Sequence, residues 1–124
     1  MKLRARGSSL RLRLTRGEVA NLAGPAGMVT ESICFAPGVA LTYRIARGNV
    51  PVVQAAFDGT SIEVLAPNGL IERWAAGDDV GFEAQQDVPG GEPLRILVEK
   101  DWNCLTPRAG EDDSDSFANP NKSC

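Results

Sequence analysis

Two short stretches of the sequence, Gly7-Ser8-Ser9-Leu10-Arg11-Leu12 and Gly59-Thr60-Ser61-Ile62-Glu63-Val64, decide how the chain folds. In both, a glycine, a hydroxyl residue and a serine precede an aliphatic, a charged and an aliphatic residue, at an offset of 52 residues. Further matches continue the pattern: Val19 with Ile71 and Leu22 with Trp74 at the same offset, and Val29 with Val80 and Arg44 with Arg95 at one residue less. Self-similarity at a fixed spacing is typical of a duplicated unit. The sequence therefore predicts an internal repeat over 1–50 and 51–102.

Each copy opens with a predicted β-hairpin. Gly7-Ser8 suits a tight two-residue turn that needs glycine first, and Gly59-Thr60 repeats it. Such turns set apolar side chains opposite one another on one side of the hairpin: Leu3 with Leu12, Ala5 with Leu10, Phe57 with Ile62, and Ala55 with Val64. The apolar positions change parity across the turn in both copies, as a two-residue hairpin requires.

A short helix is expected after each hairpin. Thr15 and Glu18 form a T-x-x-E capping box, and Pro67 suits the first turn of the second helix. Gly24 and Gly77 are expected to end the two helices. After each helix, apolar residues alternate with polar ones on both sides of a glycine-containing turn, which indicates two more strands per copy.

These elements predict an α+β fold. Two tandem β-β-α-β-β units form a mostly antiparallel curled sheet or a partly closed barrel, with two short helices and an irregular C-terminal tail. We expect one domain over 1–108, followed by an acidic tail over 109–124. The sequence does not give the strand order.

The composition narrows the function classes. The chain has 124 residues, a net charge of -3 and no histidine. Without histidine, Ser-His-Asp and Cys-His catalysis and His-ligated metal sites are excluded, so we expect a protein that is not an enzyme. No apolar run is long enough to span a membrane, and no secretory signal is evident, so we expect a cytoplasmic protein without a membrane partner.

The outer face of the first hairpin is a candidate binding surface. Lys2 is expected opposite Arg13, and Arg4 opposite Arg11, which are like-charged pairs that destabilise a sheet. The second copy does not repeat these charges, so we interpret the four residues as an anion or acidic-partner surface. The alternative is a solvated basic face. A nucleic acid is not the expected partner, because no aromatic residue interleaves the patch and the whole chain is acidic.

The tail is opposite in charge to that hairpin. Residues 109–124 carry four acids and one lysine, whereas residues 1–16 carry six bases and no acid. We therefore expect the tail to lie across the basic hairpin, in its own chain or in a neighbouring copy, with Phe117 as an apolar anchor. A disordered tail that aids solubility is the alternative.

The thiols near the C-terminus allow other chemistry. Two cysteines and three acids form a candidate zinc or other divalent-metal site: Cys104, Cys124, Asp112, Asp113 and Asp115. The spacing lacks a C-x-x-C pair, and the alternative is three reduced cysteines without a ligand. Cys104 and Cys124 could also pair, but a cytosolic setting argues against a disulfide. A third hypothesis is an enzyme in which Cys104 acts as the nucleophile, with Lys100 or Asp101 nearby. No base of suitable pKa accompanies Cys104. No cofactor is otherwise predicted.

Both ends of the chain resemble a family of short bacterial proteins known only as hypothetical, a domain of unknown function. The resemblance is carried by four stretches: Lys2-Leu3-Arg4, Gly7-Ser8-Ser9-Leu10-Arg11-Leu12-Arg13-Leu14-Thr15, Glu99-Lys100-Asp101-Trp102-Asn103-Cys104-Leu105 and Glu111-Asp112-Asp113-Ser114-Asp115-Ser116-Phe117-Ala118-Asn119-Pro120. It implies a bacterial, stand-alone protein and brings no activity, cofactor or active site. Our leading hypothesis is a non-catalytic binding or adaptor protein with a protein partner or a second copy of itself. A metal-binding protein is the alternative.

Overall fold

The computed structural model describes residues 1–101 and residue 117. Eight strands and two helices follow one another in the order predicted, β-β-α-β-β twice, so the α+β fold of two tandem units is confirmed. The first unit contains β1 (Lys2–Arg6), β2 (Ser9–Leu14), α1 (Arg16–Ala23), β3 (Met28–Ala36) and β4 (Val39–Gly48). The second contains β5 (Gln54–Phe57), β6 (Ser61–Pro67), α2 (Asn68–Ala76), β7 (Gly81–Gln86) and β8 (Leu94–Lys100).

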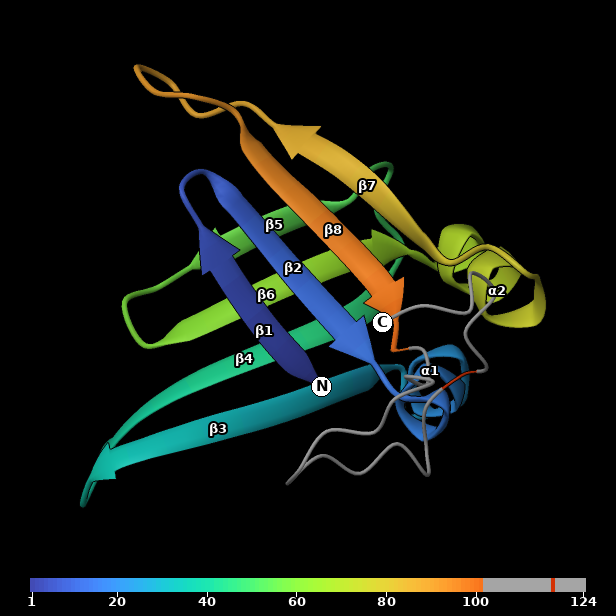
Figure 1. Ribbon diagram of the computed structural model, residues 1–124, viewed down its shortest axis with the longest axis horizontal. Coiled ribbons are helices and arrows are strands. Elements are labelled where there is room, and N and C mark those ends of the chain that lie inside the picture. The colour runs from blue at the N-terminus through green and yellow to red at the C-terminus, as the bar shows by residue number, and fades with distance from the viewer. Residues whose placement is uncertain (102–116, 118–124) are drawn as a thin grey trace, which may run out of the picture.

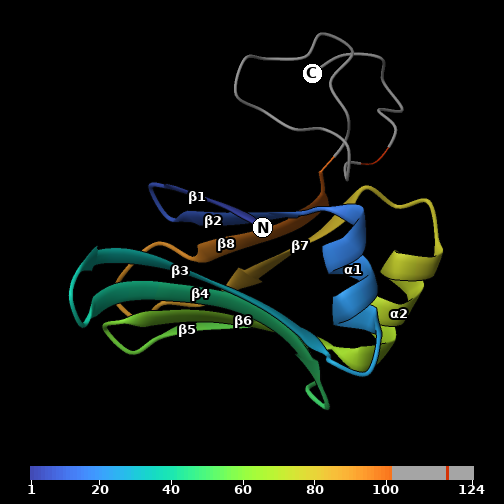
Figure 2. The same cartoon turned by 90° about the horizontal axis from the view of Figure 1, so that it is seen from below.

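The strands form two four-stranded sheets that lie one over the other (Figures 1 and 2). Sheet A has the order β1-β2-β8-β7 and sheet B the order β3-β4-β6-β5. Each sheet therefore takes one hairpin from each unit. The hairpins pair antiparallel within themselves, and they join through parallel pairings of β2 with β8 and of β4 with β6. The arrangement is two separate sheets and not a closed barrel.

The register of both opening hairpins agrees with the sequence prediction. In the first, Leu3 pairs with Leu12 and Arg4 with Arg11, and Gly7 in the turn has a φ of 54°. In the second, the pairs Phe57–Ile62 and Ala55–Val64 form as expected. A positive φ is a conformation that glycine adopts without steric cost, which is why the turn residue recurs in the repeat.

The shorter offset expected for the later strands is wrong. Ile45 of β4 and Val98 of β8 both pair with the middle of the neighbouring parallel strand, at Val64 and at Leu12, so the structural offset there is 53 residues. The reason is one extra residue in a helix: α1 has eight residues and α2 has nine. The offset therefore grows by one across the helix, whereas the sequence match suggests that it shrinks.

Both helices lie at one end of the two sheets (Figures 1 and 2). The predicted capping box of α1 is present, with the Thr15 side chain accepting from the Glu18 amide and the Glu18 side chain accepting from the Thr15 amide. Helix α2 begins directly after Pro67 without a side-chain cap. Gly24 and Gly77 end the helices as expected. Helices of two turns need tertiary packing for stability.

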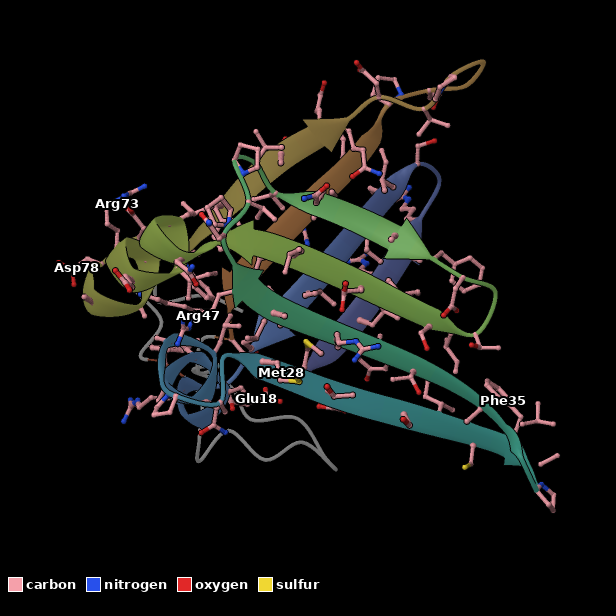
Figure 3. All side chains as sticks on the ribbon, turned by 180° about the vertical axis from the view of Figure 1, so that it is seen from behind. Glu18, Met28, Phe35, Arg47, Arg73 and Asp78 are labelled. Carbon is pink, nitrogen blue, oxygen red and sulfur yellow. The ribbon has the colours of Figure 1, made fainter. Side chains whose placement is uncertain are left out.

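The core lies between the inner faces of the two sheets and against the helices. Its fully buried side chains come from both units and include Leu12, Leu14, Leu22, Ile45, Val64, Ile71, Trp74, Ile96 and Val98. The Trp74 ring meets the Phe82 ring edge-on, with centroids 5.2 Å apart. Toward the β3–β4 turn, the long hairpin leaves the shared core, and Phe35 is 69% exposed at its far end (Figure 3).

Two basic side chains hold the helices to the sheets at equivalent places in the two units. Arg47 of β4 donates to the carbonyls of Leu22 and Gly24 at the end of α1, over 3.0 and 2.8 Å, and to Asn68 of α2 over 2.9 Å (Figure 3). Lys100, 53 residues later, is buried and donates over 2.9 Å to the Gly77 carbonyl that follows α2. Each cation satisfies carbonyl groups that a helix C-terminus leaves unpaired.

We predict that Arg47→Met lowers the free energy of unfolding by about 2–3 kcal/mol, because three charge-assisted hydrogen bonds at the helix ends are lost together. Urea denaturation measures the change. Arg44→Met is the matched control: Arg44 is three residues earlier and makes a half-exposed ion pair with Glu63, worth less than about 1 kcal/mol. Equal losses in the two variants would contradict the capping role of Arg47.

Candidate anion-binding face

The outer face of sheet A presents its residues in three rows across the four strands. The pairing registers give the rows Lys2–Arg13–Glu99–Gly81, Arg4–Arg11–Leu97–Glu83 and Arg6–Ser9–Arg95–Gln85, in the strand order β1-β2-β8-β7. Six basic side chains therefore share one face, and we call this set, Lys2, Arg4, Arg6, Arg11, Arg13 and Arg95, the basic face. None of the twelve positions is aromatic.

The four residues that the sequence predicts for an anion surface, Lys2, Arg4, Arg11 and Arg13, lie together on this face in the expected cross-strand pairs. Sequence reasoning missed two further members. Arg6 has the same parity in β1 as Lys2 and Arg4, which is a signal present in the sequence. Arg95 comes from β8, which pairs with β2 in parallel, and no local pattern indicates that pairing.

Part of the positive charge is compensated, contrary to the expectation that the like-charged pairs stand alone. The Asp101 carboxylate lies 3.2 Å from the Lys2 ammonium and 4.0 Å from the Arg13 guanidinium. Arg11 contacts Glu99 at 2.9 Å. These acids follow from the placement of β8 beside β2, which brings the end of the second unit onto the face of the first hairpin.

The compensation is uneven along the face. Asp101 and Glu99 lie toward the row of Lys2 and Arg13, and Arg95 pairs with Glu83 at 3.0 Å. The side chains of Arg4 and Arg6 have no ion pair or hydrogen bond with any other residue in the described part of the chain. The uncompensated charge is therefore concentrated at the Arg4–Arg6 end.

A hollow lies at this end. It has a volume of about 310 Å³ and is lined by Arg4, Arg6, Ser9, Arg11, Arg95 and Leu97, so four guanidinium groups surround it. A second, more open hollow of about 470 Å³ adjoins it around the Gly7-Ser8 turn and is shared through Arg6, Ser9 and Arg95. Its far side is formed by Gln85, Glu92 and Pro93. The smaller hollow is at the low end of the size range of ligand sites.

Sheet B supplies an internal reference for this face. At the offset of 52 residues, the β5–β6 hairpin of sheet B has Gln54, Ala56, Glu63 and Leu65 where sheet A has Lys2, Arg4, Arg11 and Arg13. Glu63 is paired with Arg44 at 3.3 Å. The same backbone arrangement thus forms without a basic face, and the six bases are not a requirement of the fold.

Phe117 is the one residue of the predicted tail that the structure describes. Its amide donates to the Asp101 carbonyl over 2.7 Å, and its partly buried ring packs against the core. The cations of Lys100 and Arg16 lie 5.3 and 5.8 Å from the ring centroid, within the range of cation–π contacts. The prediction of an apolar anchor at Phe117 agrees with this contact. Residues 109–116 and 118–124 lie outside the described residues.

The metal hypothesis also falls outside the described residues, because Cys104, Cys124, Asp112, Asp113 and Asp115 are not among them. It stays a prediction. Within residues 1–101 and 117, no group of three or more Cys, Asp or Glu side chains is arranged to hold a metal ion. Cys34 is an exposed free thiol on the long β3–β4 hairpin.

A second charged cluster joins the first residue to helix α1 and to sheet B. The Met1 ammonium contacts the carboxylates of Glu18 and Glu31, and the Tyr43 hydroxyl donates to Glu31 over 3.2 Å. Burial on its own lowers the pKa of the ammonium, but hydrogen bonds and attraction from the two carboxylates outweigh it and raise that pKa. For Glu31, burial raises the pKa, but the hydrogen bond and charge of the ammonium, together with the hydrogen bonds of Tyr43 and Glu18, outweigh burial and lower the pKa. The cluster fixes the start of β1.

The comparisons with known proteins agree with the resemblance noted in the sequence. A family model described as a family of unknown function (DUF7009) matches residues 1–121. The chain belongs to DUF7009. No curated protein and no solved structure matches the chain. The description of DUF7009 names no activity, so the surfaces of this chain are what bear on its function. In the described part of this DUF7009 chain, no helix has the length and apolarity to cross a membrane.

We predict that Arg4→Gln raises the free energy of unfolding at low salt by a few tenths to about 1 kcal/mol, since it relieves the like-charged pair with Arg11. Arg11→Gln is the matched control, because it relieves the same pair but also removes the ion pair with Glu99. Urea denaturation at low and high salt compares the two, and the gain should shrink as salt rises. A loss of stability in Arg4→Gln would show that Arg4 has a structural role.

We predict that Glu31 stabilises the fold only within a window of pH. Its pKa is lowered on folding, so its contribution is present above its ordinary pKa of 4.5 and is lost as pH falls through the lower folded value. The ammonium has a raised pKa, so its contribution is present below its ordinary value of 8.0 and is lost as pH rises through the folded value. The stability difference between the parent chain and Glu31→Gln, from urea curves, should therefore be largest between these limits. A difference independent of pH would contradict the assignment.

Proposed function

We propose that this chain is a non-catalytic binding protein whose basic face binds an acidic segment of another protein or of a second copy of the chain. The observation that carries the proposal is the charge of the outer face of sheet A, where six bases stand against the acids Glu83, Glu99 and Asp101. The equivalent face of sheet B lacks this excess. A surface charge that costs stability and that the fold does not need supports a role in binding.

The chemistry of the face favours a protein partner over a nucleic acid. Proteins that bind single strands combine positive charge with aromatic side chains on which bases stack. The outward positions of β1, β2, β8 and β7 include no aromatic residue, and the chain as a whole carries a net charge of -3. Guanidinium groups in contrast match the two oxygens of a carboxylate through paired hydrogen bonds. A row of arginines at strand spacing suits the carboxylates of an extended acidic segment.

The nearest acidic segment in sequence is the chain's own residues 109–124, with four acids. Phe117 contacts Asp101, whose carboxylate lies beside Lys2 and Arg13 at one edge of the basic face. This contact supports the proposal that the acidic tail, from the same chain or from a second copy, competes with a partner for the basic face. The proposal includes self-association through the tail.

We predict that the full chain binds a synthetic peptide rich in Asp and Glu at low salt, and that binding weakens as salt shortens the Debye length to about 8 Å and below. The double variant Arg4→Gln with Arg6→Gln should lose most of the affinity, because these two side chains have no acid of their own in the described chain. Fluorescence anisotropy of the labelled peptide measures binding. Arg44→Gln, on the outer face of sheet B, is the matched control and should bind like the parent chain.

A second arm of the experiment addresses the tail. Neutralising the acids with Glu111→Gln, Asp112→Asn, Asp113→Asn and Asp115→Asn keeps Phe117 in place, and it should raise peptide affinity if the tail competes for the face. Gel filtration of the same variant at low salt reports self-association, alongside a chain ending at Arg108. The proposed function is wrong if the parent chain does not bind the acidic peptide, or if the Arg4 and Arg6 variant binds it as well as the parent.

A further inference from the structure

The uncompensated end of the basic face has the charge and shape of a site for one specific group. We propose that the hollow lined by Arg4, Arg6, Arg11 and Arg95 binds the phosphoryl group of a phosphorylated residue within the acidic segment. The inference rests on the proposed function and adds to it the chemical identity of the central contact. A carboxylate-only segment is the alternative that the experiment must separate from it.

Charge balance favours a dianion in the hollow. Its four guanidinium groups carry four positive charges, and the two acids paired with them, Glu99 with Arg11 and Glu83 with Arg95, return two negative ones. The net charge of the set is therefore two positive. A phosphoserine carries a charge of about −1.5 to −2 at neutral pH, whereas a glutamate carries one negative charge. A phosphoryl group neutralises the hollow, and a carboxylate leaves it positive.

The donors around the hollow suit a group with three acceptor oxygens. Each guanidinium has five N–H donors, and those of Arg4 and Arg6 have no acceptor among the described residues. Ser9 does not add a donor, because its hydroxyl already donates to the Arg6 carbonyl over 2.7 Å. Recognition therefore comes from arginine alone, the residue best matched to the paired oxygens of phosphate.

The charges on the two sides of the hollow predict in which direction the bound acidic segment runs across the basic face. On one side lies the more open hollow with Glu92, which accepts from the Ser8 hydroxyl over 3.3 Å and repels an acidic side chain. On the other side lie Lys2 and Arg13, whose side chains are 58% and 40% exposed. The acidic residues of the segment therefore extend from the phosphoryl group toward Lys2 and Arg13, and neutral residues occupy the side near Glu92.

Three synthetic peptides of one acidic sequence, with phosphoserine, glutamate or serine at a single central position, test the inference by isothermal titration calorimetry on the full chain. The phosphoserine peptide is expected to bind about tenfold or more tighter than the glutamate peptide, which corresponds to about 1.4 kcal/mol. Inorganic phosphate is added as a competitor, and it should displace the phosphopeptide only at much higher concentration than the phosphopeptide itself requires.

Two double variants remove the same number of charges from the basic face. Arg4→Gln with Arg6→Gln removes the free donors at the hollow, and the preference for phosphoserine over glutamate should disappear. Lys2→Gln with Arg13→Gln is the matched control, away from the hollow. It should weaken all three peptides while leaving the ratio between phosphoserine and glutamate unchanged. Thermal melting confirms that both variants are folded before binding is compared.

Each outcome separates the two proposals. Equal binding of the phosphoserine and glutamate peptides would overturn the phosphoryl site and leave the binding of acidic segments standing. No binding of any peptide would overturn both. Displacement by inorganic phosphate at the concentration at which the phosphopeptide binds would assign the hollow to a free phosphate ion and overturn the phosphorylated segment as its occupant. Loss of the phosphoserine preference in the Lys2 and Arg13 variant would place the site elsewhere on the face.

Discussion

The rest of the structure depends on two parallel strand pairings, β2 with β8 and β4 with β6. They join hairpins from opposite halves of the chain, so each sheet is completed only by the other half. At their centres Leu12 lies beside Val98 and Ile45 beside Val64, and all four side chains are at most 1% exposed. A single β-β-α-β-β unit supplies only one hairpin to each sheet, so each of these residues would lack its neighbour on the adjacent parallel strand. The second unit therefore completes both sheets, and the β2–β8 pairing brings together opposite ends of the described chain.

Because the core is fixed by the inner faces, the outer faces of the two sheets are free to differ. Sheet B has an outer face with one internal ion pair, between Arg44 and Glu63, and sheet A carries the six bases of the basic face. The two faces share a hairpin geometry and differ in charge, which makes sheet B a built-in comparison for sheet A. Positive charge that the common fold does not require is costly to keep, and functional sites are where proteins accept such costs.

Local features of the fold were predictable from the sequence, and long-range ones were not. The turn at Gly7 fixes which residues face each other across the first hairpin, because only a few residues separate the partners. The neighbour of β2 on its other side is β8, and nothing near Ser9–Leu14 indicates that strand. For the same reason the sequence predicted the like-charged pairs of the first hairpin but not the acids beside them, Asp101 and Glu99, nor the base Arg95. The one-residue difference between α1 and α2 concealed the true register of the later strands.

Lys100, the last residue of β8, and Asp101, the residue after it, connect the core, the basic face and residue 117. Lys100 points inward to the end of α2 and lies over the Trp74 ring, while Asp101 points outward to Lys2 and Arg13. The backbone of Asp101 also pairs with Leu14 and Phe117. The carboxylate of Asp101 thus compensates the positive charge at one end of the basic face, and the backbone of the same residue binds Phe117. The positive charge that no acid compensates lies at the opposite end of the basic face, at Arg4 and Arg6, and an external anion is attracted most strongly there. This follows from the position of β8, whose C-terminal end brings Glu99 and Asp101 to the side of Lys2 and Arg13.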